Sequence, residues 1–281
     1  MKKYGQAKQI AFWLLLAALA LAPFAGTAAA SYTAGGGEVE DGVFYAIAIG
    51  TIDSRPPEVT GEYAIAIGAS TKADGACGTA VGYFASAIGL YSSAYGQFVS
   101  AKGEGSVATG CEAQATGLYS AATGFEAEAS GIRSSAYGAK AQAMGTGSLA
   151  AGSDAYAGGA NGTAVGFSAS AGGENSSAYG MGAYAQGTDS LAAGNGAGAV
   201  DANTTAVGAS AVAKFEGSTA IGYKANATIA GSVALGAGSY ANRTTTATGV
   251  YVPAGASGGG ITATVKGTDN GVVSIGDATD V

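Results

Sequence analysis

Residues 106–131 read SVATGCEAQATGLYSAATGFEAEASG, and the pattern in this stretch predicts the fold. Glycine occupies every seventh position, and alanine stands two residues before each glycine. The residue four before the glycine alternates between Ser and Ala, so the true unit has fourteen residues, roughly S-x-A-x-G-x-x-A-x-A-x-G-x-x. A repeat this regular predicts a repetitive architecture.

The same spacing extends over most of the chain. Glycine holds it without exception over residues 61–194, and over residues 61–236 only Asp201, Phe215 and Ile229 replace it. A seven-residue period first suggests a coiled coil, but each glycine inside a helix costs about 0.8–1 kcal/mol relative to alanine. The heptad also lacks the apolar a and d pairs that a coiled coil needs. We therefore reject a coiled coil for the repeat region.

The repeat fits short strands better than helices. Side chains alternate along a strand, so the Ser, Ala and Gly of S-x-A-x-G share one face, and that face has only small residues. Two five-residue strands and two two-residue corners make a closed coil with a narrow interior. Stacked coils pair as parallel strands about 4.7–4.9 Å apart. The sequence predicts an all-β solenoid, a parallel β-roll, with about thirteen fourteen-residue coils between Gly61 and Arg243.

Composition excludes other repetitive classes. The chain has 281 residues, of which 50 are glycine and 11% are charged. Collagen needs glycine at every third residue and much proline, whereas only four prolines occur here. Disorder requires low hydrophobicity, and an apolar content of 48% argues against it.

The N-terminus has the features of a secretory signal peptide. Three lysines precede an apolar run at residues 10–22, and three alanines follow at residues 28–30. This pattern predicts a signal peptide over residues 1–30, with an uncleaved membrane anchor as the alternative. Cleavage would change the formal net charge from −7 to −10, because three lysines and no acids are removed. Such an acidic chain is a poor nucleic-acid binder.

The Ser-type strands have uncharged outward positions, without amide side chains. A long apolar exterior stripe marks an interface, so we expect an oligomer in which these strands face a symmetry axis. Ordinary variation in surface polarity is the alternative. The predicted interface residues are Tyr95, Val107, Tyr137, Leu149, Val165, Tyr179, Leu191, Val207, Ile221 and Leu235.

The Ala-type strands have a polar exterior. We expect ligand contacts on this side, and the alternative for each residue is a solvated side chain without a ligand. The predicted ligand-face residues are Lys102, Gln114, Glu128, Gln142, Tyr156, Tyr184 and Lys214.

Two of the units carry a family resemblance. Residues 231–239 read GSVALGAGS and residues 217–222 read GSTAIG, which resemble the SVAIGxxS head repeats of trimeric autotransporter adhesins, the YadA-like heads. The resemblance covers about residues 44–243. It implies a left-handed β-roll, a homotrimer, display on the outer membrane of a Gram-negative bacterium, and attachment to host cells or matrix proteins, a role in virulence. The handedness and the number three come from the resemblance alone.

The resemblance also suggests how the chain is organised. We expect a flexible leader at residues 31–43, the head repeats at residues 44–243, and a cap or collar at residues 244–281. Residues 270–276 resemble the opening of the neck that follows such heads. The stalk and membrane anchor of a complete family member are not evident in the sequence, so the chain resembles a head without its anchor.

Catalytic and cofactor chemistry has no support in the sequence. Histidine is absent, so His-based triads and His-metal sites are excluded. We expect no enzyme activity, metal, cofactor or small-molecule substrate. Cys77 and Cys111 fall on opposite corners about two and a half coils apart, roughly 12 Å on the strand spacing. A disulfide needs Cα atoms within about 7 Å, so we predict free thiols or intermolecular bridges.

Two functions remain for such a solenoid. The first is an adhesive head that binds the host cell surface or matrix proteins. The second is a structural or ice-binding solenoid without an adhesive role. Ice binders present regular threonine ladders on a flat face, and here the outward threonines are interrupted by Val, Leu and Tyr. The pattern therefore favours the adhesive head.

Overall fold

A computed structural model describes residues 31–50, 56–242 and 273–275. The predicted signal peptide at residues 1–30 and most of the predicted cap at residues 244–281 lie outside this part of the chain. The chain divides into residues 1–30 and the remainder, and the fold described below belongs to the remainder.

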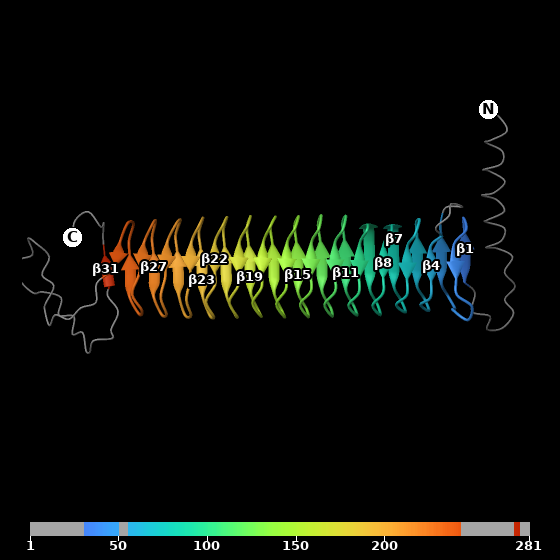
Figure 1. Cartoon of the computed structure of the whole chain (residues 1–281), viewed down its shortest axis with the longest axis horizontal. Helices are drawn as coiled ribbons and strands as arrows, with labels where there is room; N and C mark the ends of the chain where they lie inside the picture. Colours follow the sequence, from blue (N-terminus) through green and yellow to red (C-terminus); the bar gives the residue numbers. More distant parts are fainter. Residues whose placement is uncertain (1–30, 51–55, 243–272, 276–281) are drawn as a thin grey trace, which may run out of the picture. The chain divides into compact units, whose positions relative to one another are not determined.

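Two parallel sheets make up this unit, and the chain alternates between them at each step (Figure 1). The first has 16 strands, all with odd labels, and is named the odd sheet. Its strands are β1 Tyr32–Ala34, β3 Ile47–Ile49, β5 Ile65–Ile67, β7 Thr79–Tyr83, β9 Ser93–Gln97, β11 Val107–Thr109, β13 Ala121–Thr123, β15 Ser135–Tyr137, β17 Leu149–Ala151, β19 Thr163–Val165, β21 Ser177–Tyr179, β23 Leu191–Ala193, β25 Thr205–Val207, β27 Thr219–Ile221, β29 Val233–Leu235 and β31 Val273–Ile275.

The second sheet has 15 shorter strands and is named the even sheet. Its strands are β2 Glu38–Val39, β4 Glu58–Val59, β6 Lys72–Ala73, β8 Ser86–Ala87, β10 Ser100–Ala101, β12 Gln114–Ala115, β14 Glu128–Ala129, β16 Gln142–Ala143, β18 Tyr156–Ala157, β20 Ser170–Ala171, β22 Tyr184–Ala185, β24 Gly198–Ala199, β26 Val212–Ala213, β28 Asn226–Ala227 and β30 Tyr240–Ala241.

Each repeat forms one coil, and each coil lies in register on the next. In the odd sheet Val107 pairs with Ala121, and Ala121 pairs with Ser135, a step of fourteen residues each time. The prediction of an all-β parallel solenoid with fourteen-residue coils is confirmed. The stack has about 15 turns, more than the thirteen predicted, because it extends beyond Gly61 towards the N-terminus. The left-handed sense and the trimer stay predictions.

The interior of the coils is filled almost entirely by alanine. The alanines of both sheets that point inward are fully buried, and the largest buried apolar side chains among the described residues are Val59 and Val99. Buried serines, with Thr71 and Thr204, occupy most of the remaining inward positions, and Ser120 Oγ donates to the Gly117 carbonyl at 2.7 Å. The narrow interior predicted from the small residues is therefore present.

The predicted leader at residues 31–43 differs from expectation. It contains β1 and β2, which pair with β3 and β4 and so add a coil to the stack. The Tyr32 amide donates to the Ala46 carbonyl at 2.8 Å, and the Glu38 amide donates to the Pro57 carbonyl at 2.9 Å. The open edge of the next coil offers unpaired backbone groups, and this segment satisfies them despite its departure from the repeat.

One strand of the predicted cap also joins the stack. In β31, Val273 pairs with Val233 and Ile275 pairs with Leu235, so the odd sheet continues past β29. The Val-Ser-Ile sequence has the same period-two pattern as the Val-Ala-Leu of β29. Within the neck-like sequence, Val273–Ile275 thus contribute a strand to the odd sheet.

Tight turns form the corners between strands. The Ser120 amide donates to the Gly117 carbonyl at 3.3 Å, and Tyr119, two residues after the glycine, has a φ of 56°. This is the position of a type II turn that requires positive φ and usually holds Gly or Asn. The corners also pair from coil to coil, because the Tyr119 amide donates to the Glu104 carbonyl at 2.7 Å.

The two kinds of corner explain where glycine is replaced. After each odd-sheet strand from β5 to β29 the repeat glycine has a positive φ, 134° at Gly110 for example, which favours glycine. After the even-sheet strands the repeat glycines have no such angle. Asp201, Phe215 and Ile229 all fall on this second kind of corner, where a side chain is conformationally allowed.

Candidate functional site

The outer face of the odd sheet is uncharged along its length. No strand of this sheet contains Asp, Glu, Lys or Arg. All ten residues of the predicted interface lie in these strands and point outward. Large apolar side chains are left open in the single chain, with Tyr95 41%, Tyr137 46% and Tyr179 44% exposed. The three tyrosines recur every three coils.

The outer face of the even sheet is more polar, and it holds the predicted ligand-face residues. Gln114, Glu128, Gln142, Tyr156 and Tyr184 occupy the first position of β12, β14, β16, β18 and β22. In the ladder they form one column, in which Ser170 of β20 separates the two tyrosines. Lys102 and Lys214 follow directly after β10 and β26, and both are exposed. The structure thus brings together five of the seven residues and places the two lysines on the same side.

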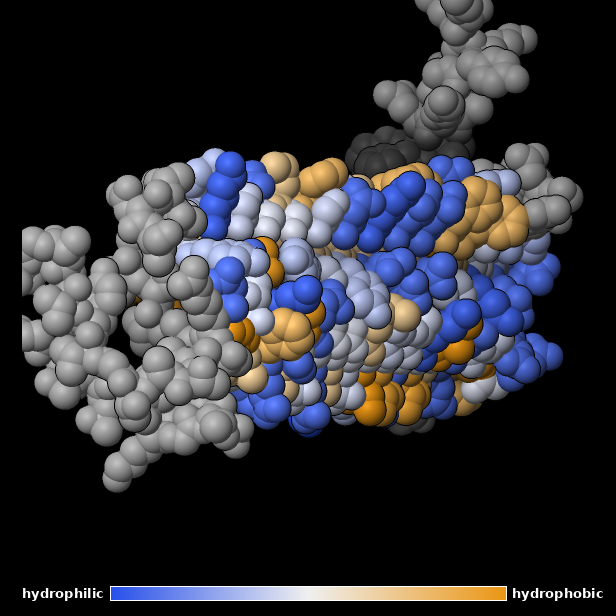
Figure 2. Space-filling model, turned by 60° about the vertical axis from the view of Figure 1, so that its left-hand side comes forward, coloured by the Kyte–Doolittle hydropathy of each residue, from blue (hydrophilic) through white to orange (hydrophobic). Residues whose placement is uncertain are grey.

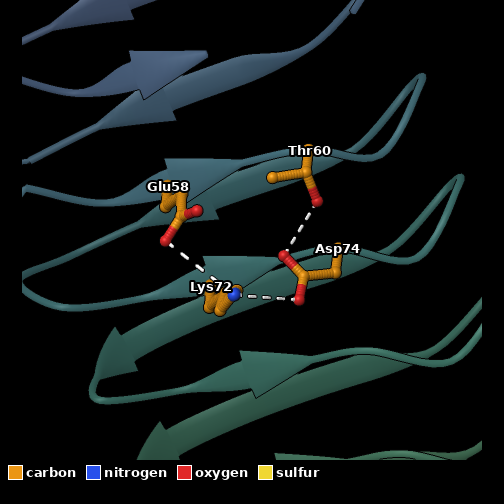
Figure 3. Close-up of polar contacts among 4 residues, drawn as sticks. All are labelled: Glu58, Thr60, Lys72 and Asp74. Carbon is orange, nitrogen blue, oxygen red and sulfur yellow. Dashed lines mark hydrogen bonds and ion pairs between the residues drawn. The ribbon is translucent and has the colours of Figure 1, made fainter. Parts of the chain in front are cut away.

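A charged network links the first coils of the even sheet (Figure 3). Lys72 Nζ lies 3.2 Å from Asp74 Oδ2 and 3.9 Å from Glu58 Oε2, and Thr60 Oγ1 donates to Asp74 Oδ1 at 2.9 Å. The hydrogen bond to Asp74, together with the negative charges of Asp74 and Glu58, raises the pKa of Lys72 above its ordinary value. The sequence interpretation missed this network, because Glu58 and Lys72 become neighbours only through the ladder.

An open depression of about 310 Å³ lies beside this network, lined by Glu38, Val39, Glu40, Glu58 and Thr60. Its carboxylates do not form a metal site, since no group of three His, Cys, Asp or Glu suited to a metal ion occurs among the described residues. We assign the depression no ligand.

The corners carry exposed aromatic side chains that the sequence interpretation did not single out. Tyr45 and Tyr63, on neighbouring coils, stack with ring centroids 5.0 Å apart. On the opposite corner Phe84 and Phe98 stack at 5.3 Å, and Tyr83 meets both rings edge-on. Hydrophobic and hydrophilic residues form short runs along the visible surface of the stack (Figure 2).

The corner polarity changes along the chain. In the column that contains Tyr119, later coils have Asn161, Asn175 and Asp189 instead, and each side chain bonds to the next. Asn161 Nδ2 donates to Asn175 Oδ1 at 3.0 Å, and Asn175 Nδ2 donates to Asp189 Oδ1 at 3.0 Å. This column could have been found in the sequence, since its residues all stand two places after a repeat glycine.

Both cysteines are free within the chain, as predicted. Cys77 is exposed on one corner, and Cys111 is half-buried on the opposite corner. The register derived from the repeat is thereby supported.

These features define the class of the protein as a parallel β-solenoid with one uncharged and one polar face. Comparison with protein-family models identifies the YadA head domain repeat (two copies) at residues 60–85, 101–127, 157–183 and 216–239. The chain carries YadA head domain repeats, and its solenoid is consistent with the head of a trimeric autotransporter adhesin. The predicted resemblance is confirmed. No curated protein sequence matches the chain.

The matched repeats are typical of a broad class of proteins. YadA heads are trimeric, generally non-enzymatic modules of bacterial adhesins exposed at the cell surface. Over residues 31–50, 56–242 and 273–275 no helix is long and apolar enough to cross a bilayer.

Proposed function

We propose that this chain is the homotrimeric head of an adhesin that attaches a bacterium to host cells or to their extracellular matrix. The observation that carries the proposal is the division of the solenoid exterior. The odd sheet has no charged residue in any strand, whereas the even sheet presents glutamine, glutamate, asparagine and lysine side chains. One face suits self-association, and the other remains available for a ligand.

Apolar side chains exposed on the outer face of the odd sheet support an oligomer that would bury them. Ile221 and Leu235 are 39% and 42% exposed in the single chain, and they lie in register on adjacent coils. Burying such side chains stabilises an assembly by about 25 cal/mol per Å² of apolar surface. Because a single coil interior contains little more than alanine, this outer burial supplies apolar contact area that the interior lacks. The family repeats supply the number three.

The register argues against an ice-binding role. In the odd sheet Thr109 pairs with Tyr95 on one side and with Thr123 on the other, and Thr123 then pairs with Tyr137. The bulky phenol rings interrupt the threonine column after two coils. A flat, regular array of hydroxyl groups is therefore absent from the odd-sheet strands β9 to β15.

The site of action follows from the family. We propose display on the outer membrane of a Gram-negative bacterium, with a role in virulence, and export directed by residues 1–30. The partners proposed are two further copies of the chain and host surface or matrix proteins. Nucleic acid is disfavoured by the formal net charge of −7.

Assembly is tested with charge substitutions on the two faces. Leu149→Asp combined with Val165→Asp places carboxylates on adjacent strands of the odd sheet, and should convert the trimer to monomer in sedimentation experiments. Gln114→Asp combined with Gln142→Asp adds the same charge to the even sheet, and should leave the trimer intact. A monomeric wild-type chain, or equal behaviour of both double variants, would count against the proposal.

Adhesion is tested with the full chain coupled to fluorescent beads. Beads should attach to cultured epithelial cells or to immobilised matrix proteins, and the odd-face double variant should attach poorly because it lacks the trimer. Absence of attachment by the correctly assembled wild-type chain would refute the adhesive function while leaving the trimer untouched.

A further inference from the structure

Two tyrosines mark a distinct patch on the even sheet, at the middle of the stack. Tyr156 of β18 and Tyr184 of β22 lie in the same ladder column, with Ser170 of β20 between them. They are two coils apart, which is about 9–10 Å on the spacing of parallel strands. On the coil between them the outward residues are Ser170 and Gly172, and the Gln186 side chain lies over Gly172.

Both rings lie over glycines rather than standing away from the sheet. A Cβ placed on Gly158 would meet Tyr156 Oη and Cε1, and one placed on Gly198 would meet the ring of Tyr184. Tyr156 therefore lies along its own strand, and Tyr184 reaches across to the next coil. Aromatic rings that cover glycines on a sheet are held in place by the backbone beneath them. Tyr156 is nevertheless 41% exposed, so much of its surface remains open to a ligand.

Neutral hydrogen-bonding groups surround the rings. Gln186 Nε2 donates to Ser170 Oγ at 3.2 Å, and the Gln186 side chain lies over Gly172. Gln142 precedes Tyr156 in the column and is exposed. An amide group both donates and accepts hydrogen bonds, as a hydroxyl group does.

The patch is also free of charge. The outward residues of the even sheet from β16 to β24 are Gln142, Met144, Tyr156, Gly158, Ser170, Gly172, Tyr184, Gln186, Gly198 and Val200. None is ionised, although the chain as a whole is acidic. The same face carries Glu58, Lys72 and Glu128 in the coils before β16, and the exposed Lys214 directly after β26. A neutral ligand can bind here without desolvating an ionic group, which would be costly.

We propose that this patch binds a neutral oligosaccharide. The inference rests on the proposed adhesive function and names a ligand class for the outer face of the even sheet. The apolar C–H face of a pyranose ring stacks on an exposed aromatic face, and sugar hydroxyls exchange hydrogen bonds with the amide groups of Gln142 and Gln186. Two tyrosines separated by one coil that carries a neutral amide, Gln186, suit an extended chain in which alternate sugar rings meet a phenol. Rigid aromatic residues with neighbouring amides supply contact area at low cost in side-chain entropy.

The test uses the full chain, assembled and fluorescently labelled, on an array of neutral, sialylated and sulfated oligosaccharides. Neutral oligosaccharides should bind, and titration calorimetry should then show that Tyr156→Ala and Tyr184→Ala each weaken binding at least about tenfold. Tyr156→Phe should retain most of the affinity, because stacking requires the ring and not the hydroxyl.

A matched control is available in the same sheet. Tyr240 occupies the same outward position in β30, and its exposed fraction of 42% is similar to the 41% of Tyr156. It lies several coils away from the patch along the stack. Tyr240→Ala should therefore leave oligosaccharide binding unchanged.

The outcomes separate this inference from the proposed adhesive function. An empty array, binding confined to charged oligosaccharides, or undiminished binding by a Tyr156→Ala, Tyr184→Ala double variant with native circular dichroism would each overturn the oligosaccharide site. If beads carrying the wild-type chain still attach to immobilised matrix proteins in that case, the adhesin function stands and its ligand is protein. Failure of both assays would remove the proposed function as well.

Discussion

Two glycines of a single coil allow the geometry of the corners to be tested directly. Gly180 follows β21 and has a φ of 120°, and a Cβ added there would lie 2.7 Å from the Gly194 oxygen and 2.8 Å from its carbon. Gly182 has a φ of 62°, and an added Cβ would meet nothing within 4 Å. The same substitution by alanine therefore perturbs the two positions in different ways.

The expected magnitudes follow from these contacts. At Gly182 alanine introduces only the left-handed conformation, which costs about 1 kcal/mol. Other coils tolerate this angle at the equivalent position, for example at Lys140, Asp154 and Ser168. At Gly180 the unfavourable φ costs about 1–3 kcal/mol, and displacement of the neighbouring coil adds about 1–3 kcal/mol, as overpacking does. We expect Gly180→Ala to destabilise the protein by about 3 kcal/mol or more.

The assay is urea unfolding followed by circular dichroism. All variants are measured at one protein concentration, because the apparent stability of an oligomer depends on concentration. Both substitutions lie in the same coil, so any loss of cooperativity along the solenoid affects them alike. Gly180→Ala should shift the midpoint about three times as far as Gly182→Ala. Equal shifts would refute the argument that contact with the next coil adds to the cost of a side chain at Gly180.

Two further predictions concern the interior and the charged network. Ala150 is fully buried between Ala136 and Ala164 of the adjacent coils. Ala150→Val should therefore destabilise the protein by about 1–3 kcal/mol in the same assay. As a control, Ala139→Val on an exposed corner should change the stability by less than about 0.5 kcal/mol. The raised pKa of Lys72 means that its stabilising interaction is fully present below the ordinary lysine pKa and is lost as the pH rises through the raised value. Lys72 is 44% exposed, so the contribution is below about 1 kcal/mol. The stability difference between wild type and Asp74→Asn should stay constant up to the ordinary lysine pKa of 10.5 and should shrink as the pH rises above it. A difference that stays constant with pH would contradict the assignment.

Much of the fold could be predicted because the repeat encodes the inside of each coil. Small residues at alternating positions exclude a wide interior, and the structure fills it with alanine and serine as expected. The separation into an uncharged and a polar face was also visible, since side chains that alternate with the interior must point outward. The added coil at residues 31–43 could not be predicted in this way, because β1 and β2 lack the spacing of the repeat and are recognised only by their pairing.

The candidate site was predictable only in part. The column from Gln114 to Tyr184 could be assigned to one face from its spacing, but the orientation of the rings could not. Tyr184 covers Gly198, which is fourteen residues away in the sequence and adjacent only across the ladder. The positive φ of corner residues such as Tyr119 could also not be predicted, because it follows from the turn and not from the residue's own conformational preference.

The sequence alone thus determined the period of the coil, its narrow interior and the polarity of its two faces, since each depends on the size and alternation of residues within one repeat. The tertiary structure decided which side chains meet between coils, which corner requires a positive φ, and where the stack begins. Those features arise from contacts between residues about fourteen positions apart, and the energy of such a contact depends on the geometry of both coils.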